Sequence, residues 1–181
     1  MIKNIDELKL EWTYYPSKLL YNKCKTIDEE DFELSLEIGS KMKTMLAEQN
    51  GLGLAANQAG LDICMAIVAF PDENGDYRVL KTLINPEIVF ESPKKINSEE
   101  GCLSFPELFV EIERPYEIVV RAQLEDKGMM NIQARGLLAR ILCHEIDHLN
   151  GITMPDRLTP INREIIQPQL DKIEEEFGSE E

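Results

Sequence analysis

The chain contains only two histidines, and they stand four residues apart in the segment HEIDH at 144–148. Residues four apart lie on one face of an α-helix, so both imidazoles project in the same direction if this segment is helical. The motif is surrounded by apolar residues: Leu137, Leu138, Ile141, Leu142, Ile146 and Leu149. This pattern predicts a largely buried helix from about residue 136 to 150, whose buried imidazoles need polar partners.

A metal ion is a partner that both histidines can share, and HExxH is a known metal-binding spacing. Glu145 lies roughly 60° from His148 around a helix with about 100° per residue, so it can act on a metal ligand without binding the metal. Asp147 lies on the opposite side, where we expect it to support a histidine ring or the packing of the helix. The alternative, a polar helix face without a metal, does not explain why the two histidines are paired.

Two histidines leave a catalytic site one ligand short, because such sites use three protein ligands and keep a fourth position for water. HEIDHLNG begins like the HExxHxxGxxH protease pattern, but Met154 stands where the last histidine belongs. A protease with a glutamate ligand could instead use Glu164. A non-enzymatic metal-binding module would close the site with a fourth protein ligand, and these alternatives stay open from the histidines alone.

Cys102 is the better candidate for the third ligand. It stands in EEGCLSFP (99–106), where Gly101 permits unusual backbone torsions beside the sulfur, so we expect an irregular, loop-like setting. Cys24 and Cys64 lie in helix-like or strand-like contexts, where a cysteine is expected to be a small buried hydrophobe.

Two further helices are expected, one on each side of HEIDH in the chain. Thr26 followed by Glu29 has the spacing of a capping box, and Asn50 followed by Gly51 is a typical stop, so a long first helix should lie between them. Thr159 and Pro160 form a typical start for a last helix. Pro168 should break or kink that helix, because proline lacks the amide donor and clashes with the preceding turn.

Several short strands are expected between the first helix and HEIDH. They are the segments 63–70, 79–90, 109–113 and 117–124, with turn signals at 71–78 and 126–128. The glycine-rich segment GLGLAANQAG (51–60) is expected to be a loop. The fold class is therefore α+β, with short, mostly antiparallel strands packed around the central metal-binding helix, an N-terminal helix and a C-terminal helix.

Composition restricts the class of protein. With 181 residues, 43% of them hydrophobic, the chain suits a single catalytic domain over 1–181. A formal charge of -15 has the wrong sign for direct nucleic-acid binding. No apolar run approaches the roughly 20 residues of a membrane span, and the N-terminus does not resemble a secretory signal, so we expect a cytoplasmic protein without membrane association. The acidic tail at about 174–181 is expected to be frayed.

Three segments of the chain form a recognisable set: GLGLAANQ (51–58), EGCLS (100–104) and HEIDH (144–148). Together they resemble the signature motifs of the peptide deformylases, in the same order and with comparable spacing, over roughly residues 16–158. The resemblance implies removal of the formyl group from the N-terminal formylmethionine of new polypeptides, with release of formate. It also implies one divalent metal ion, expected to be Fe(II), which Zn(II) or another divalent ion can replace.

The resemblance also assigns roles to individual residues. It implies that the metal ligands are Cys102, His144 and His148. Glu145 would be the acid/base, taking a proton from water and giving it to the departing amine. Gln58 and the amide of Leu103 would stabilise the negative oxygen of the tetrahedral intermediate.

For the substrate, the resemblance implies two contact regions. Leu52 and Gly53 would border the formylated peptide, which binds as an added strand. Leu137 and Ile141 would line an apolar pocket for the methionine side chain.

Some features depart from the family pattern or are open. Cys143 stands before the first motif histidine, where relatives commonly carry glutamine, so the contacts around the ligands can differ. Arg140 is a candidate partner of Glu100. The expected partner is the formylmethionyl nascent peptide, which can bring the chain near the ribosome. Bacterial relatives can dock there through a basic C-terminal helix, but this tail is acidic, so docking by that route is not expected.

Overall fold

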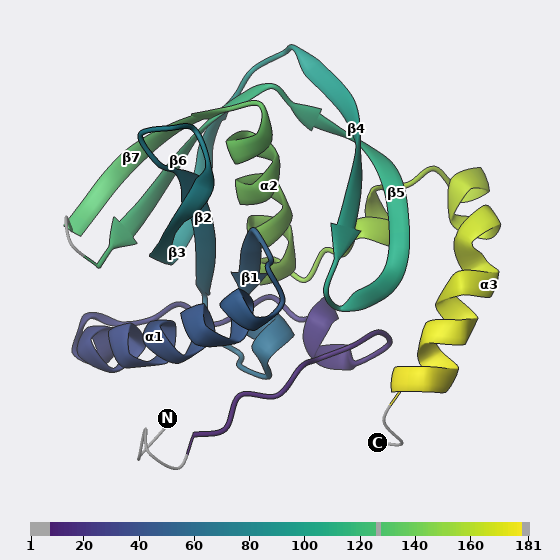
Figure 1. The fold of residues 1–181 in the computed structure, drawn as a ribbon, viewed down its shortest axis with the longest axis horizontal. Helices are drawn as coiled ribbons and strands as arrows, with labels where there is room; N and C mark the ends of the chain where they lie inside the picture. The colour runs from purple at the N-terminus through teal and green to yellow at the C-terminus, as the bar shows by residue number, and fades with distance from the viewer. Residues whose placement is uncertain (1–7, 126–127, 179–181) are drawn as a thin grey trace.

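The computed structural model describes residues 8–125 and 128–178, which form an α+β fold (Figure 1). The α-helices are α1 (Phe32–Glu48), α2 (Leu137–Leu149) and α3 (Pro160–Phe177). The strands are β1 (Gly53–Ala55), β2 (Met65–Pro71), β3 (Tyr77–Glu91), β4 (Lys95–Cys102), β5 (Phe105–Pro115), β6 (Glu117–Leu124) and β7 (Gly128–Arg135). Short 3-10 helices are η1 (Lys18–Tyr21), η2 (Glu29–Asp31), η3 (Ala56–Ala59) and η4 (Met154–Arg157).

The strands form two separate sheets. One has five strands in the order β1-β2-β3-β6-β7, and the other is the β4-β5 hairpin. The strand pairs within both sheets are antiparallel. In Figure 1, α2 lies between the five-stranded sheet and the hairpin, and α3 lies on the outer side of the hairpin. The central helix therefore contacts both sheets.

The largest core lies between α2 and the five-stranded sheet, because the apolar residues of α2 turn toward it. Its buried members include Val68, Leu83, Ile118, Val120, Ala139, Leu142, Cys143 and Ile146. A second core under α1 includes Ile38, Met42, Leu46, Leu54, Ile67 and Ile84. Burying these faces fixes α2 on the sheet and leaves its remaining face directed at β1 and the hairpin.

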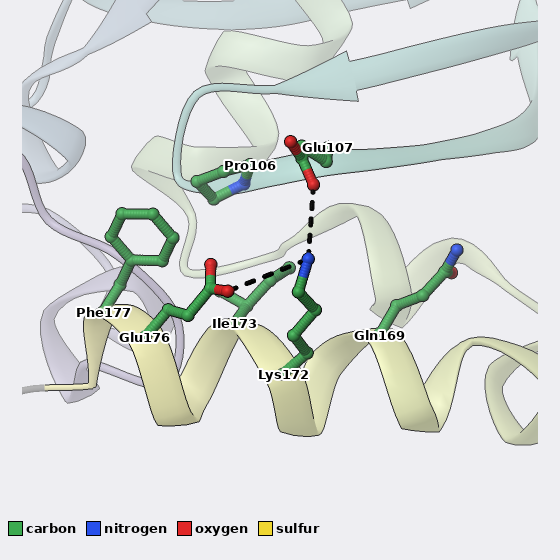
Figure 2. A pocket seen from close by; sticks show the side chains of 7 residues that line it. All are labelled: Pro106, Glu107, Gln169, Lys172, Ile173, Glu176 and Phe177. Atoms are coloured by element: carbon green, nitrogen blue, oxygen red, sulfur yellow. Dashed lines mark hydrogen bonds and ion pairs between the residues drawn. The ribbon is translucent and has the colours of Figure 1, made fainter.

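A third core joins α3 to the hairpin. Its members are Phe105, Leu108, Val110, Ile112, Met154, Ile166, Leu170 and Ile173. Beside it, a cavity of about 210 Å³ lies between α3 and the start of β5. Figure 2 shows the side chains that line it, among them Lys172, whose Nζ lies 3.5 Å from Glu107 Oε2 and 3.8 Å from Glu176 Oε1. Exposed ion pairs of this kind add little stability, so the apolar contacts hold α3 in place.

Replacing Leu170 with alanine should lower the free energy of unfolding by about 2–5 kcal/mol, because it removes a fully buried side chain from the α3–β5 core. Urea denaturation measures the change. Ile165→Ala is the matched control: Ile165 lies on the same helix but is 70% exposed, and the change should stay within about 0.5 kcal/mol. Equal stability of the two variants would show that α3 does not pack on the hairpin.

The helices differ from the sequence prediction in two details. The first helix begins at Phe32, and the expected capping box at Thr26 does not form, because Asn85 hydrogen-bonds both the N–H and the C=O of Ile27 and holds this segment against β3. The last helix begins as expected, with Thr159 as N-cap, but continues unbroken through Pro168. Packing of buried residues on both sides of the proline overrides its helix-breaking tendency.

The strands were predicted less completely than the helices. The glycine-rich segment is not simply a loop, since it contains β1 and η3, and 109–113 lies inside the longer β5. Strands β4 and β7 were missed because their largely polar or exposed residues give little alternating pattern. Of the expected turn at 126–128, residues 126 and 127 lie outside the described residues.

Two other expectations concern the C-terminal tail and a membrane-spanning helix. Residues 174–177, in the tail expected to be frayed, belong to the last turn of α3, and 179–181 lie outside the described residues. None of the helices in the described part of the chain combines the length and apolar character needed to cross a bilayer.

Candidate metal centre

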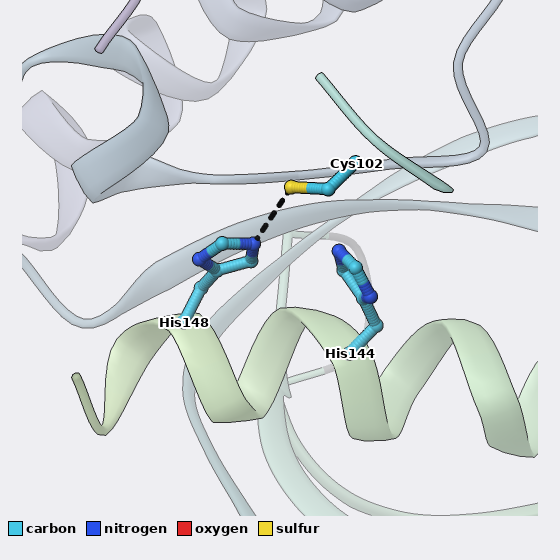
Figure 3. Close-up of side chains that lie close together, drawn as sticks. All are labelled: Cys102, His144 and His148. Atoms are coloured by element: carbon cyan, nitrogen blue, oxygen red, sulfur yellow. Dashed lines mark hydrogen bonds between the residues drawn. The ribbon is translucent and has the colours of Figure 1, made fainter. Parts of the chain in front are cut away.

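Three side chains of ligand type meet where the hairpin faces α2 (Figure 3). His144 and His148 project from one face of α2, and Cys102 approaches from the end of β4. Their ligand atoms all lie within 4.8 Å of one another, and Cys102 Sγ lies 3.2 Å from His148 Nε2. Residues more than forty positions apart in the chain therefore form one compact donor set.

Cys102 is the last residue of β4, so the expected irregular loop setting is wrong in detail. The strand register shifts between Gly101 and Cys102, and residues 103 and 104 turn the chain into β5. A Cβ at Gly101 would lie 2.6 Å from the ring of Phe109 on the opposite strand. The glycine lets the two strands approach closely just before the thiol, because a side chain there would displace Phe109.

Gln58 lies in η3 and connects β1 to the sulfur. Its Oε1 accepts a hydrogen bond from the backbone N–H of Ala55 at 2.9 Å. Because that backbone group can only donate, the Nε2 of Gln58 must face the other way. There it donates to Cys102 Sγ at 3.3 Å and Ser104 Oγ at 3.2 Å, so its N–H groups lie at the centre of the site.

Glu145 stands beside the donor set and is 4% exposed. Burial raises the pKa of its carboxyl group to about 7, although the nearby His144 opposes this shift. Its Oε2 is buried without a hydrogen-bond partner among the described residues. A Cβ at Gly53 would lie 2.1 Å from its Oε1, so the glycine leaves room for this carboxyl group. A group with a pKa near neutrality can both accept and donate a proton.

The two imidazoles have different surroundings. Glu100 Oε2 lies 3.1 Å from His144 Nδ1, which leaves His144 Nε2 for the donor set. Burial favours the neutral form of Glu100, but hydrogen bonds from His144 and Arg114 lower its pKa to about 2. Burial and the neighbouring His144 lower the pKa of His148 well below its ordinary value. A neutral imidazole is the form that binds a metal ion.

This donor set fits a divalent metal ion. Two imidazoles and one thiol match the three protein ligands of a catalytic site, and they suit Zn(II) as well as Fe(II). Among residues 8–125 and 128–178, this is the one group of three or more potential ligands that could hold a metal ion. Glu164 is exposed on α3 and outside this group, so the glutamate-ligand alternative is wrong.

The remaining candidate residues lie on α2, in the turn after Cys102 and next to β1. Leu103 directly follows Cys102 in the turn, and Leu52, which is 38% exposed, precedes β1. Leu137 is 46% exposed and Ile141 is buried. Both lie on the stripe of α2 that carries the two histidines, because positions 137, 141, 144 and 148 share one helix face.

Some buried polar residues were not assigned a role from the sequence. Asn57 is fully buried and its Nδ2 donates to the carbonyl of His148 at 2.6 Å. Ser104 is fully buried beside Gln58, and Arg114 is 4% exposed. The sequence contained a signal that could have identified Arg114: the alternation of β5 places it on the same face as Val110 and Ile112, so it is a charged residue at a buried position.

The pairing of Arg140 with Glu100 is confirmed, with Nη1 2.7 Å from Oε1.

Comparisons with known proteins agree along most of the chain. Residues 9–164 match the family model described as polypeptide deformylase. A peptide deformylase of Syntrophobacter fumaroxidans is 41% identical over 158 residues, covering 87% of this chain and 91% of that protein. A peptide deformylase of Thermodesulfovibrio yellowstonii is 39% identical over 161 residues, covering 89% of this chain and 96% of that protein. The crystal structure of a variant of Arabidopsis thaliana peptide deformylase 1B matches with a TM-score of 0.82 and 32% identity, covering 93% of this chain and 92% of that one.

Proposed function

The chain belongs to the polypeptide deformylase family, and on this basis we propose that it removes the formyl group from the N-terminal formylmethionine of new polypeptides, using the site around Cys102. The observation that carries the proposal is the meeting of Cys102, His144 and His148 within 4.8 Å beside a buried carboxyl group. These three residues would hold one divalent cation. We expect Fe(II) from the family, and Zn(II) suits the same ligands.

A cation in this place supplies Lewis-acid chemistry, polarising the formyl carbonyl and lowering the pKa of water toward neutrality. Glu145 takes a proton from the attacking water. The protonated carboxyl group then gives this proton to the amine as the C–N bond breaks, which yields formate and a free N-terminus. The raised pKa of Glu145 and the unpartnered Oε2 support this role.

Gln58 and the backbone amide of Leu103 donate hydrogen bonds to the oxygen that becomes negative in the tetrahedral intermediate. The orientation of the Gln58 amide, with its N–H groups toward Cys102, supports this assignment. Leu103 follows Cys102 directly, so its amide lies on the hairpin side of the same site.

The peptide binds along β1 as an added strand. Support comes from the position of β1 at one edge of the five-stranded sheet, and from the proximity of Gly53 to Glu145. Leu52 borders the same edge. Leu137 and Ile141 line the pocket for the methionine side chain, because they share a face of α2 with the two histidines.

The partner is the formylmethionyl nascent peptide, and we place the reaction in the cytoplasm, where this substrate is made. Proximity to the ribosome follows from the substrate. Docking through the end of α3 is not expected, since Glu174, Glu175 and Glu176 repel a polyanionic surface.

Formate release tests the activity directly. The metal-loaded chain should release formate from formyl-Met-Ala-Ser. Acetyl-Met-Ala-Ser should yield far less acetate, because its extra methyl group makes the acyl group larger than the formyl group that the proposed site accepts. The peptide bonds should stay intact. Cleavage between the residues without release of formate would overturn the proposal.

Gln58→Ala should lower kcat for formate release by about 100- to 1,000-fold, as expected when one oxyanion donor is lost. The variant should retain its metal ion, which metal analysis checks. Gln133→Ala is the control, because Gln133 is exposed on β7 and should behave as wild type. A Gln58→Ala variant with wild-type kcat would remove Gln58 from the mechanism.

A further inference from the structure

The proposed metal ligands come from two parts of the fold that share no strand pairing. Cys102 belongs to the β4-β5 hairpin, which is a sheet of its own, whereas both histidines belong to α2. The separation between the sulfur and the imidazoles therefore depends on the side chains that fix the hairpin on α2.

Arg114 makes this connection from the buried face of β5. Its Nε and Nη2 donate to the two oxygens of Glu100 at 2.9 and 3.0 Å, and its Nη1 donates to Asp147 Oδ2. Glu100 stands two residues before Cys102 on β4, and Asp147 stands directly before His148 on α2. One guanidinium group therefore joins the strand that carries the sulfur to the helix that carries the imidazoles.

The connection continues to a ligand through Glu100. The Oε2 of Glu100 faces His144 Nδ1 at 3.1 Å, while its Oε1 accepts from Arg140 at 2.7 Å. Arg140 lies on α2 and also donates to the hairpin carbonyls of Ser98 and Ile112 at 3.2 and 3.0 Å. Both arginines thus bridge the hairpin and α2, and both hold the carboxylate that orients the ring of His144.

Stability alone does not account for this network. A buried ion pair is often no more stabilising than an apolar pair of the same volume, because both charges lose their hydration. What a planar guanidinium adds is geometry, since its fixed fork of donors sets the direction as well as the distance of each carboxylate.

We propose that Arg114 is a positioning residue which, assisted by Arg140, fixes the position of the β4-β5 hairpin on α2. Arg114 thereby controls metal affinity without touching the metal. This inference rests on the metal centre proposed above. Loss of the fixed donors of the Arg114 guanidinium leaves the β4-β5 hairpin and α2 folded. It lets the sulfur of Cys102 move relative to the two imidazoles.

Arg114→Lys is the test, because it keeps the charge and removes the fork. Co(II) binding to the full chain is measured by competition with a chelator, together with the thiolate-to-cobalt charge-transfer absorption that reports the bond to Cys102. The variant should bind Co(II) roughly 10- to 100-fold more weakly, the usual effect of losing a partner of a metal ligand, and its charge-transfer band should weaken.

Arg157→Lys is the matched control. Arg157 donates to the same Asp147, from Nε at 2.9 Å, but it comes from η4 and its side chain is 42% exposed. Its replacement should leave Co(II) affinity and the charge-transfer band unchanged. An equal loss in both variants would overturn the inference, because it would trace the effect to Asp147 rather than to the hairpin.

The remaining outcomes separate the inference from the proposed function. Wild-type affinity and band intensity in folded Arg114→Lys overturn the inference alone. A wild-type chain that binds Co(II) without a thiolate band overturns the metal centre, and the inference with it. If circular dichroism shows that Arg114→Lys does not fold, Arg140→Lys decides in the same assay: a weaker band supports the inference and an unchanged one overturns it.

Discussion

Glu145→Ala should lower kcat/KM for formate release from a formyl-Met peptide by about 100- to 10,000-fold, with the larger value expected because one carboxyl group serves both proton transfers. Burial raises the pKa of this group to about 7, where it can exchange protons near neutral pH. The carboxyl group of Glu145 occupies space beside β1 that a side chain at Gly53 would fill. Steady-state kinetics on the metal-loaded variant measures the loss.

The loss must be separated from loss of the metal. Metal analysis should find the same content in Glu145→Ala as in wild type, because Glu145 is beside the donor set and not part of it. Glu99→Ala controls for the removal of an acidic residue, since Glu99 is exposed on β4. Full activity in Glu145→Ala would assign the proton transfers to another group.

Cys102→Ala should abolish tight metal binding and, with it, formate release. Losing one of three ligands should weaken binding by more than the roughly 10- to 100-fold that follows from losing an outer partner. Equilibrium dialysis against a divalent cation, followed by the formate assay, measures both effects. The sulfur is also the acceptor for the Gln58 amide, so the geometry of the whole site depends on it.

Two variants control for this change. Cys64→Ala removes a thiol that packs near Cys24, Ala55, Ala66 and Leu149, and it should retain the metal. Glu164→Ala should also retain the metal, because this residue is exposed on α3. A metal that stays bound in Cys102→Ala but is lost in Glu164→Ala would restore the protease interpretation that the structure contradicts.

The sequence predicted the site best where local geometry decides the outcome. The spacing of His144 and His148 places both rings on one helix face whatever the rest of the chain does. Their meeting with Cys102 is a long-range contact, which periodicity cannot reveal. The sequence around Cys102 made it the better candidate for the third ligand, and the family motifs then assigned it that role. The role of Gln58 also came from the motifs, because a single glutamine in a glycine-rich segment indicates little by itself.

The features that were missed depend on tertiary contacts. The first helix starts late because Asn85 holds Ile27, a contact between residues 58 positions apart. Pro168 is tolerated because α3 is packed against β5. Arg114 could be recognised as a charged residue on a buried strand face, but its partners Glu100 and Asp147 lie on two other elements, so only the structure identifies what it connects.

X-ray absorption at the metal edge of the Zn(II)-loaded chain reports the atoms bonded to the cation and so identifies its ligands. We expect one sulfur at about 2.3 Å and two imidazole nitrogens at about 2.0–2.1 Å, with a light atom from solvent as the fourth ligand. A cation without a sulfur ligand, or with fewer than two imidazole ligands, would contradict the proposed metal centre.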